Sequence, residues 1–184
     1  MIDLETLSVK PNAVILTIGA AKFNRNGPEK PLEELNTFYK RIQIQSCLSV
    51  GLQTCKETVK WWTTQDKEAR LEAFDGDDRI PLKQMLDDFT SWFGTNKNTK
   101  IWSHGDDFDC VILASAFRAF GMEPPWKFWN TRDTRTLFDL ANFSLKSIPN
   151  TKLHHALYDT YAQILGVQIC IQELRKNEIK IKNY

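Results

Sequence analysis

The sequence lacks the features that assign a chain to several specialised classes. Its four cysteines form no C-x-x-C pair and have no regular spacing with histidines, so we expect reduced thiols and no zinc site. They are Cys47, Cys55, Cys110 and Cys170. No apolar run approaches the length of a membrane span, and acidic residues follow Met1 almost at once, where a leader would have basic ones. We therefore expect a cytoplasmic protein that has no contact with membranes.

An excess of charge of one sign is also lacking, because 24 Lys and Arg residues balance 23 Asp and Glu residues. A nearly neutral protein does not attract polyanions through its overall field, so any contact with a nucleic acid has to be local. The chain has no internal repeat, low-complexity tract or long linker. Its 184 residues suit one compact domain over 1–184, with a polar C-terminal tail from about residue 176.

Hydrophobic periodicity predicts strands in the first part of the chain and mainly helices after it. Residues 1–5, 13–23 and 36–44 alternate or form β-branched apolar runs, as strands do. Helical spacing begins near Lys56, and a further short strand is expected at 100–103. The other expected helices cover 66–74, 81–93, 107–120 and 156–174. This order predicts an α/β fold in which helices flank a mixed β-sheet.

The first predicted strand carries two acidic residues that are two positions apart. Such residues project from the same face of a strand, so Asp3 and Glu5 present adjacent carboxylates while Leu4 points the other way. Adjacent carboxylates repel one another unless a cation lies between them, and Mg²⁺ and Mn²⁺ prefer oxygen ligands. The alternative is an exposed acidic strand end, and this pair taken alone favours that alternative.

Two predicted helices each carry a single acid on an apolar or small-sided face. The residues that define these faces are Ile112, Leu113, Ala116, Phe117 and Phe120 after Asp109, and Ala156, Ala162, Gly166 and Cys170 around Asp159. Burying an acid on such a face is costly unless it is hydrogen-bonded, paired or bound to a metal. Each acid could instead only stabilise the positive end of its own helix. Both Asp109 and Asp159 are therefore candidate metal ligands.

Two histidines precede Asp159, and a histidine is the natural group to deprotonate water near neutral pH. On a regular helix His155, four residues before Asp159, would share its face. His154 would lie about 140° around the helix from Asp159, so it can act there only from the preceding loop. These residues alone leave both histidines open, and a structural role is the commoner one.

Five segments of the chain occur in an order that is typical of one enzyme superfamily. D-L-E-T-L at 3–7, H-G-D-D-F-D at 104–109 and H-H-A-L-Y-D at 154–159 resemble the three motifs of the DEDDh 3′-5′ exonucleases, including the H-x4-D spacing. Two others carry a likeness to the exonuclease A group of T-even bacteriophages and its bacterial 3′-5′ exoribonuclease-like relatives. They are W-W-T-T-Q-D-K-E-A-R at 61–70 and K-F-W-N-T-R-D-T-R-T at 127–136.

The resemblance, which spans about residues 1 to 165, implies an RNase H-like fold and two bound cations, Mg²⁺ or Mn²⁺. Asp3, Glu5 and Asp159 match the ligands of one ion, and Asp3 would bridge to the second. Asp109 matches the residue that assists the second ion. The whole set is therefore expected to form a two-metal site.

The same resemblance matches the general base to His154 and leaves His155 as its neighbour. It implies hydrolysis from the 3′ end with release of nucleoside 5′-monophosphates. The phage-like character favours DNA as the substrate and the host cytoplasm as the location if the protein is phage-encoded. A 3′-5′ exoribonuclease of the same fold is the alternative.

The expected partner is the single-stranded or frayed 3′ end of a nucleic acid. By resemblance, Thr6 and Leu7 should meet the terminal nucleotide, with Leu7 wedging against its base. Tryptophans at 61–62 could stack on bases or pack in the core, and arginines could contact phosphate or pair with nearby acids. The expected contacts are Thr6, Leu7, Trp62, Gln65, His104, Arg132 and Arg135.

Two other classes of function remain open from the sequence. The chain could bind nucleic acid without cleaving it, or it could be a structural or partner-binding domain whose acids are scattered in space. A homodimer is also an open possibility.

Overall fold

Five β-strands lie at the centre of the computed structural model, which describes residues 1–150 and 152–182. They are β1 Ile2–Thr6, β2 Ile15–Lys22, β3 Asn36–Arg41, β4 Ile101–Ser103 and β5 Thr131–Asp133. The first three form an antiparallel sheet in the order β1-β2-β3, and β4 pairs with β5 in parallel. Contacts between β1 and β4 place the two sheets side by side. The arrangement is the mixed α/β, RNase H-like fold that the sequence predicted.

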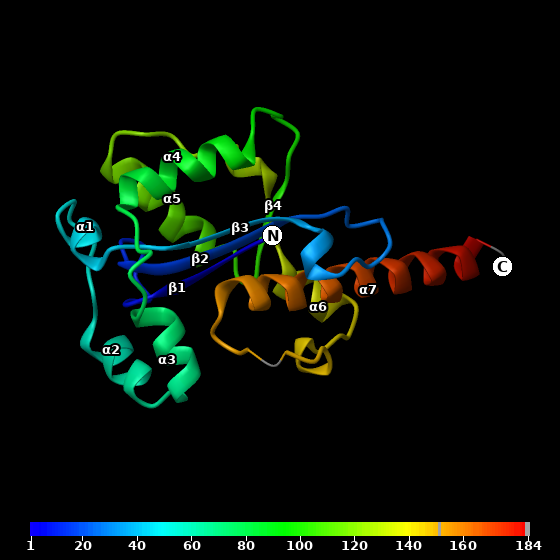
Figure 1. The fold of residues 1–184 in the computed structure, drawn as a ribbon. Coiled ribbons are helices and arrows are strands. Elements are labelled where there is room, and N and C mark those ends of the chain that lie inside the picture. Colours follow the sequence, from blue (N-terminus) through cyan, green and yellow to red (C-terminus); the bar gives the residue numbers. More distant parts are fainter. Residues whose placement is uncertain (151, 183–184) are drawn as a thin grey trace.

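Helices cover the strands from both sides. Within the described residues they are α1 Ile44–Leu48, α2 Lys56–Thr63, α3 Lys67–Phe74, α4 Leu82–Phe93, α5 Asp109–Ala119, α6 Thr134–Leu140 and α7 Ala156–Lys182. Figure 1 shows α4 and α5 above the antiparallel strands and α6 and α7 below them, with α2 and α3 near one end of the sheet. The strands are thereby enclosed between helical layers.

The main core lies between the sheet and the layer of α4 and α5. Along β2 only the last residue, Lys22, is exposed, because this central strand is covered on both faces. Helix α4 contributes one apolar stripe at helical spacing. Its members are Leu82, Met85, Leu86, Phe89 and Phe93, all of which are buried. These side chains, with those of α5, form one continuous cluster with the strand residues.

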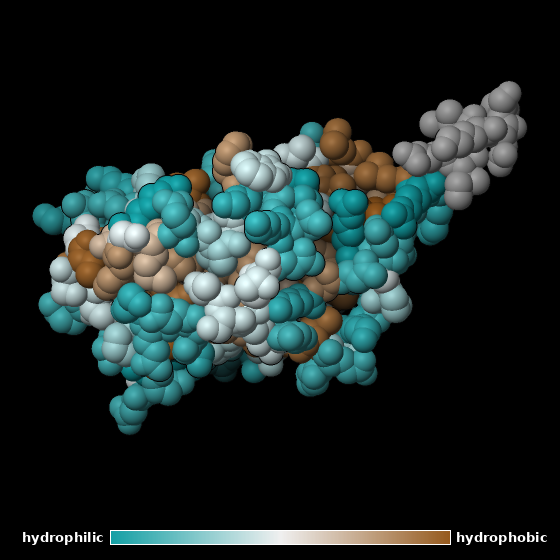
Figure 2. All heavy atoms as spheres, turned by 90° about the horizontal axis from the view of Figure 1, so that it is seen from above, coloured by the Kyte–Doolittle hydropathy of each residue, from teal (hydrophilic) through white to brown (hydrophobic). Residues whose placement is uncertain are grey.

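The face of the molecule on the side of α4 is largely hydrophilic. Figure 2, seen from the side of α4, shows hydrophilic residues interrupted by separate apolar patches. The larger exposed apolar side chains include Phe128, Trp129 and Leu153. In the described part of the chain, no helix combines the length and the apolar character that a membrane span requires.

Helix α7 packs on the sheet through a very close contact with β2. A Cβ atom at Gly19 would lie 2.2 Å from the carbonyl carbon of Ala156 and 2.3 Å from the amide nitrogen of Leu157, so glycine is required here. The Thr160 hydroxyl donates a hydrogen bond to the Gly19 carbonyl oxygen over 3.1 Å. Because Gly19 pairs with Asp3 across the sheet, this contact places the first turn of α7 beside Asp3.

The structure differs from the sequence-based expectations in several places. Helix α1 and strand β5 were not expected, because both are too short to show a period. Helix α7 continues to Lys182, so the segment expected to be a tail from about residue 176 is helical. Pro81 is the N-cap of α4 and not its first residue. Gly166, expected on the face of Asp159, packs against Phe138 of α6, since a Cβ there would lie 2.8 Å from that ring.

Replacing Gly19 by alanine should destabilise the fold and displace the start of α7. The new methyl group would overlap the backbone of Ala156, and overpacking of this kind costs about 1–3 kcal/mol. We expect the free energy of unfolding, measured in urea, to fall by that amount. The matched control is Gly27→Ala in the turn between β2 and β3, where the atoms nearest to the added Cβ belong to the Asn24 side chain, the closest at 3.2 Å. Equal stability of the two variants would contradict the prediction.

Candidate active site

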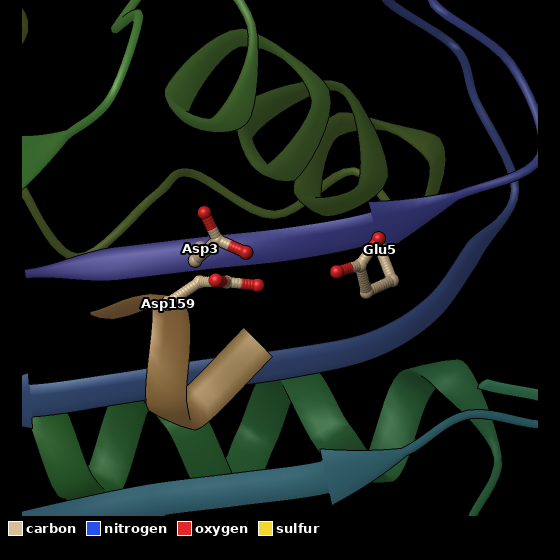
Figure 3. Close-up of side chains that lie close together, drawn as sticks. All are labelled: Asp3, Glu5 and Asp159. Atoms are coloured by element: carbon tan, nitrogen blue, oxygen red, sulfur yellow. The ribbon is translucent and has the colours of Figure 1, made fainter. Parts of the chain in front are cut away.

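Three carboxylates converge where β1 faces the first turn of α7 (Figure 3). Asp3 and Glu5 come from β1, and Asp159 reaches them from the helix. One carboxylate oxygen of each residue lies within 4.8 Å of those of the other two. We call Asp3, Glu5 and Asp159 the acidic cluster. Negative groups at this spacing repel one another unless they are protonated or share a cation.

Asp109 lies in the first turn of α5 and lines the same cleft. It is only 3% exposed, and its Oδ1 accepts a hydrogen bond from the backbone N–H of Leu4 over 3.0 Å. Leu4 lies between Asp3 and Glu5, so this bond ties Asp109 to the strand that carries two of the cluster carboxylates. The fold therefore brings all four predicted acids to one cleft, with Asp109 beside the cluster.

Two amide side chains, which the sequence analysis missed, hold carboxylates of the cluster. Gln163 Nε2 donates to Asp3 Oδ1 over 2.8 Å, and Asn150 Nδ2 donates to Asp159 Oδ1 over 2.7 Å. Gln163 follows Asp159 by four residues and therefore shares its helix face, a signal that was present in the sequence. Asn150 has no comparable signal, because its contact depends on the path of a loop.

Burial raises the pKa values of all four acids, and repulsion from the other carboxylates adds to this at Asp3 and Glu5. Burial is the largest cause for the pKa of Asp3, and the carboxylates of Asp109, Glu5 and Asp159 raise it further. The pKa of Glu5 is raised by burial and then by Asp159 and Asp109. Burial raises the pKa of Asp109 to about 7 and that of Asp159 to about 6, although hydrogen bonds act in the opposite direction at both. Charging the site fully therefore requires a compensating cation.

The chemistry of the site fits a hard divalent cation. Within the described residues, no Lys or Arg side chain forms a salt bridge with any of the four acids. The potential ligands of the cluster are carboxylate oxygens, which Mg²⁺ and Mn²⁺ prefer. A divalent ion held by the acidic cluster would supply the charge that the protein itself does not provide.

The two histidines before α7 have different surroundings. His154 lies in the turn that precedes the helix, with a positive φ of 61°, and it lines the cleft. The expectation that His154 lies in the preceding loop is therefore confirmed. Its ring contacts the rings of Trp61 and Trp62.

His155 belongs to a separate network on the side of β3. Its Nε2 lies 3.6 Å from the Glu72 carboxylate, and its ring centroid lies 4.8 Å from those of Tyr39 and Tyr158. Glu72 also accepts hydrogen bonds from Arg41 at 2.8 and 2.7 Å. This network joins α3, β3 and the start of α7, and within the described residues its side chains form no hydrogen bond or salt bridge with the acidic cluster.

The acidic cluster lies in a cleft of about 1710 Å³. Three of the residues predicted to contact substrate, Thr6, His104 and Arg135, line this cleft. The guanidinium of Arg135 lowers the pKa of Asp109, against the larger opposite effect of burial. Trp61 also lines the cleft and is 42% exposed. The cleft therefore combines carboxylates, a basic side chain and an accessible aromatic ring.

Leu7 and Trp62 do not line the cleft, which corrects two of the expected substrate contacts. Leu7 is 5% exposed and packs in the main core. Trp62 is 1% exposed, and its Nε1 donates a hydrogen bond to the carbonyl oxygen of Thr6 over 2.9 Å. A buried indole cannot stack on a base, so Trp61 is the tryptophan of the pair that substrate can reach.

Gln65 and Arg132 also lie away from the cleft. Gln65 Nε2 donates to the carbonyl oxygen of Trp61 over 3.2 Å. Arg132 Nη1 donates to the carbonyl oxygens of Trp129 and Thr131 over 3.0 and 2.6 Å. Both side chains therefore satisfy backbone groups of their own segments, and neither lies beside the acidic cluster.

Comparison with known proteins defines the class to which this fold and cleft belong. Residues 1–171 match the family described as the 3′-5′ exoribonuclease Rv2179c-like domain. The chain belongs to this family and is a 3′-5′ exonuclease, an enzyme whose substrate is a nucleic acid. The likeness to 3′-5′ exonucleases that the five sequence segments indicated is therefore confirmed.

One particular relative is the exodeoxyribonuclease of Enterobacteria phage T4. The two sequences are 26% identical over 195 aligned residues, which cover 95% of this chain and 85% of the phage protein. The similarity thus extends over nearly the whole chain.

Divalent cations should stabilise the protein, and more so as the pH rises. The acids have higher pKa values in the folded protein than in an unfolded chain, so their protonated forms stabilise the metal-free fold. This stabilisation is fully present below about pH 4. It is lost as the pH rises through about 6 and 7, the pKa values of Asp159 and Asp109. Because metal ions compete with protons for the same oxygens, we expect the increase in Tm caused by Mn²⁺ or Mg²⁺ to grow between pH 5 and pH 7.5.

Differential scanning fluorimetry with and without the metal measures this increase. Asp159→Asn should abolish it, whereas Asp87→Asn should retain it, because Asp87 pairs with Lys83 on the exposed face of α4. A metal effect that is independent of pH, or that survives in Asp159→Asn, would speak against cation binding by the cluster.

Proposed function

We propose that this exonuclease degrades DNA from the 3′ end with two divalent cations, Mg²⁺ or Mn²⁺, and releases nucleoside 5′-monophosphates. The observation that carries the proposal is the acidic cluster, with its three carboxylates within 4.8 Å of one another and a fourth on the same cleft. Asp3, Glu5 and Asp159 would hold one ion, and Asp3 with Asp109 would hold the second.

Phosphodiester hydrolysis needs a nucleophilic water and relief of the charge on the leaving 3′ oxygen, and two divalent cations supply both when they are bound. His154 would accept the proton of the attacking water, because burial holds its pKa below the usual value and keeps the imidazole neutral near pH 7. Gln163 and Asn150 would keep the carboxylates of Asp3 and Asp159 oriented. Arg135 would donate hydrogen bonds to phosphate oxygens from the cleft wall.

DNA is the proposed substrate because the phage relative, which aligns with 95% of this chain, is described as an exodeoxyribonuclease. RNA is the second candidate, because the family is described as a 3′-5′ exoribonuclease domain. The two substrates differ at the 2′-hydroxyl, which proteins read through contacts to the sugar. Matched DNA and RNA oligonucleotides therefore distinguish the two candidates directly.

With Mg²⁺ or Mn²⁺, the purified protein should shorten a 5′-labelled DNA oligonucleotide stepwise from its 3′ end. His154→Ala should reduce the rate about 10²- to 10⁴-fold, the usual contribution of general base catalysis. His155→Ala is the matched control and should retain the activity, because that side chain belongs to the Glu72 network. Gel electrophoresis follows the shortening, and mass spectrometry identifies the nucleotide released.

The outcome of this assay also decides between the competing functions. Tight binding without turnover, unaffected by EDTA, would favour a binding module and contradict the proposed chemistry. Faster shortening of the matched RNA would transfer the proposal to the second candidate. Equal loss of activity in His154→Ala and His155→Ala would remove the specific role of His154.

A further inference from the structure

The imidazole of His154 is held by aromatic rings. Its centroid lies 5.0 Å from that of Trp61, with an interplanar angle of 89°, and 6.1 Å from that of Trp62, with an angle of 73°. Within the described residues, its ring nitrogens form no hydrogen bond with another side chain. Edge-to-face contacts of this kind restrain the orientation of a ring.

The two indoles that contact His154 are themselves fixed in place. They meet edge to face with centroids 5.1 Å apart, and Trp62 makes a second such contact with Phe74 at 5.4 Å. The hydrogen bond from Trp62 Nε1 to the Thr6 carbonyl oxygen ties the pair to β1. Thr6 directly follows Glu5, so the support for His154 is anchored to the strand that carries two of the cluster carboxylates.

The backbone of His154 adds a second constraint. Its φ of 61° lies in the left-handed region, which residues other than glycine seldom adopt. A backbone conformation of this kind persists only where the surroundings enforce it. Asn150, in the same loop, is bonded to Asp159, so the turn that carries His154 is fixed to the first part of α7.

We propose that Trp61 and Trp62 are positioning residues, which form an aromatic cradle that orients the His154 imidazole toward the acidic cluster. The inference rests on the proposed function, because it gives His154 the task of accepting a proton from water. Trp62 is the buried residue of the cradle and is held by its hydrogen bond to Thr6, and Trp61 is the residue that lines the cleft. These roles agree with the exposures of the two adjacent side chains, 42% for Trp61 and 1% for Trp62.

A different role for Trp61 would be to stack on a base of the substrate, as aromatic side chains do in proteins that bind single strands. The two roles differ in kinetics. A residue that orients the general base acts on the chemical step and changes kcat, whereas one that only binds substrate changes KM. The anchored contacts of Trp61 with His154 and Trp62 favour the positioning role.

Nuclear magnetic resonance of the metal-free full-length protein tests the cradle without any hydrolysis. The chain has only 3 histidines, so single substitutions can assign the imidazole signals. Ring currents of the two indoles should displace the His154 signals, and Trp61→Ala should return them toward those of a free imidazole. The His155 signals should stay in place because that ring contacts tyrosines. Trp129→Ala removes another exposed indole, one that is not on the cleft, and should move neither set.

Kinetics with an oligonucleotide and saturating Mg²⁺ or Mn²⁺ provide the second readout. Trp61→Ala should lower kcat about 10- to 100-fold at unchanged KM, since small displacements of catalytic groups have effects of this size. Trp61→Phe should restore much of the loss because it retains an aromatic ring. Trp62→Phe retains a ring but loses the bond to Thr6, so it should lower kcat even where the protein remains folded.

Two results would overturn the cradle: His154 signals that do not move in Trp61→Ala, or a rise in KM at unchanged kcat, which would assign Trp61 to base stacking. An inactive wild-type protein would instead overturn the proposed function. Even then, the shift of the His154 signals in Trp61→Ala would show whether the two tryptophans hold the ring. Failure of the cradle and failure of the proposed function are therefore distinguishable.

Discussion

The close approach of α7 to β2 at Gly19 is the contact on which the rest of the site depends. The alternation of side chains along strand β1 places the carboxylates of Asp3 and Glu5 on one face. The third carboxylate belongs to α7, and this helix approaches β2 so closely that no side chain would fit at position 19. The Thr160 hydroxyl bonds to the Gly19 carbonyl group and secures the same turn. Through this one contact Asp159 and Gln163 reach the strand together, and the turn before the helix brings His154.

The site that results is unfavourable in the absence of a compensating charge. Four buried or half-buried acids share one cleft, their pKa values are raised, and no Lys or Arg within the described residues forms a salt bridge with them. Amide side chains and backbone N–H groups hold the carboxylates in place without neutralising them. The fold thus maintains an arrangement that a divalent cation completes. A protein of almost balanced charge can in this way act on a polyanion through one local region.

Local regularity explains which parts of this site were predictable from the sequence. The shared face of Asp3 and Glu5 follows from the strand period, and the family likeness added the choice of His154 over His155 and the RNase H-like arrangement. The exposures of Leu7 and Trp62 could not be predicted, because which of two neighbouring side chains is buried depends on packing against distant residues. The bond from Asn150 to Asp159 depends on the path of a loop, and β5 is too short to show a period.

If the carboxylates of the cluster share a cation, anomalous diffraction from crystals soaked in MnCl₂ will locate it. We expect a manganese peak within about 2.5 Å of carboxylate oxygens of Asp3, Glu5 and Asp159, and the loss of this peak in Asp159→Asn. Manganese bound only elsewhere, or no peak at the cluster at a pH where its acids are ionised, would show that these carboxylates do not share a cation.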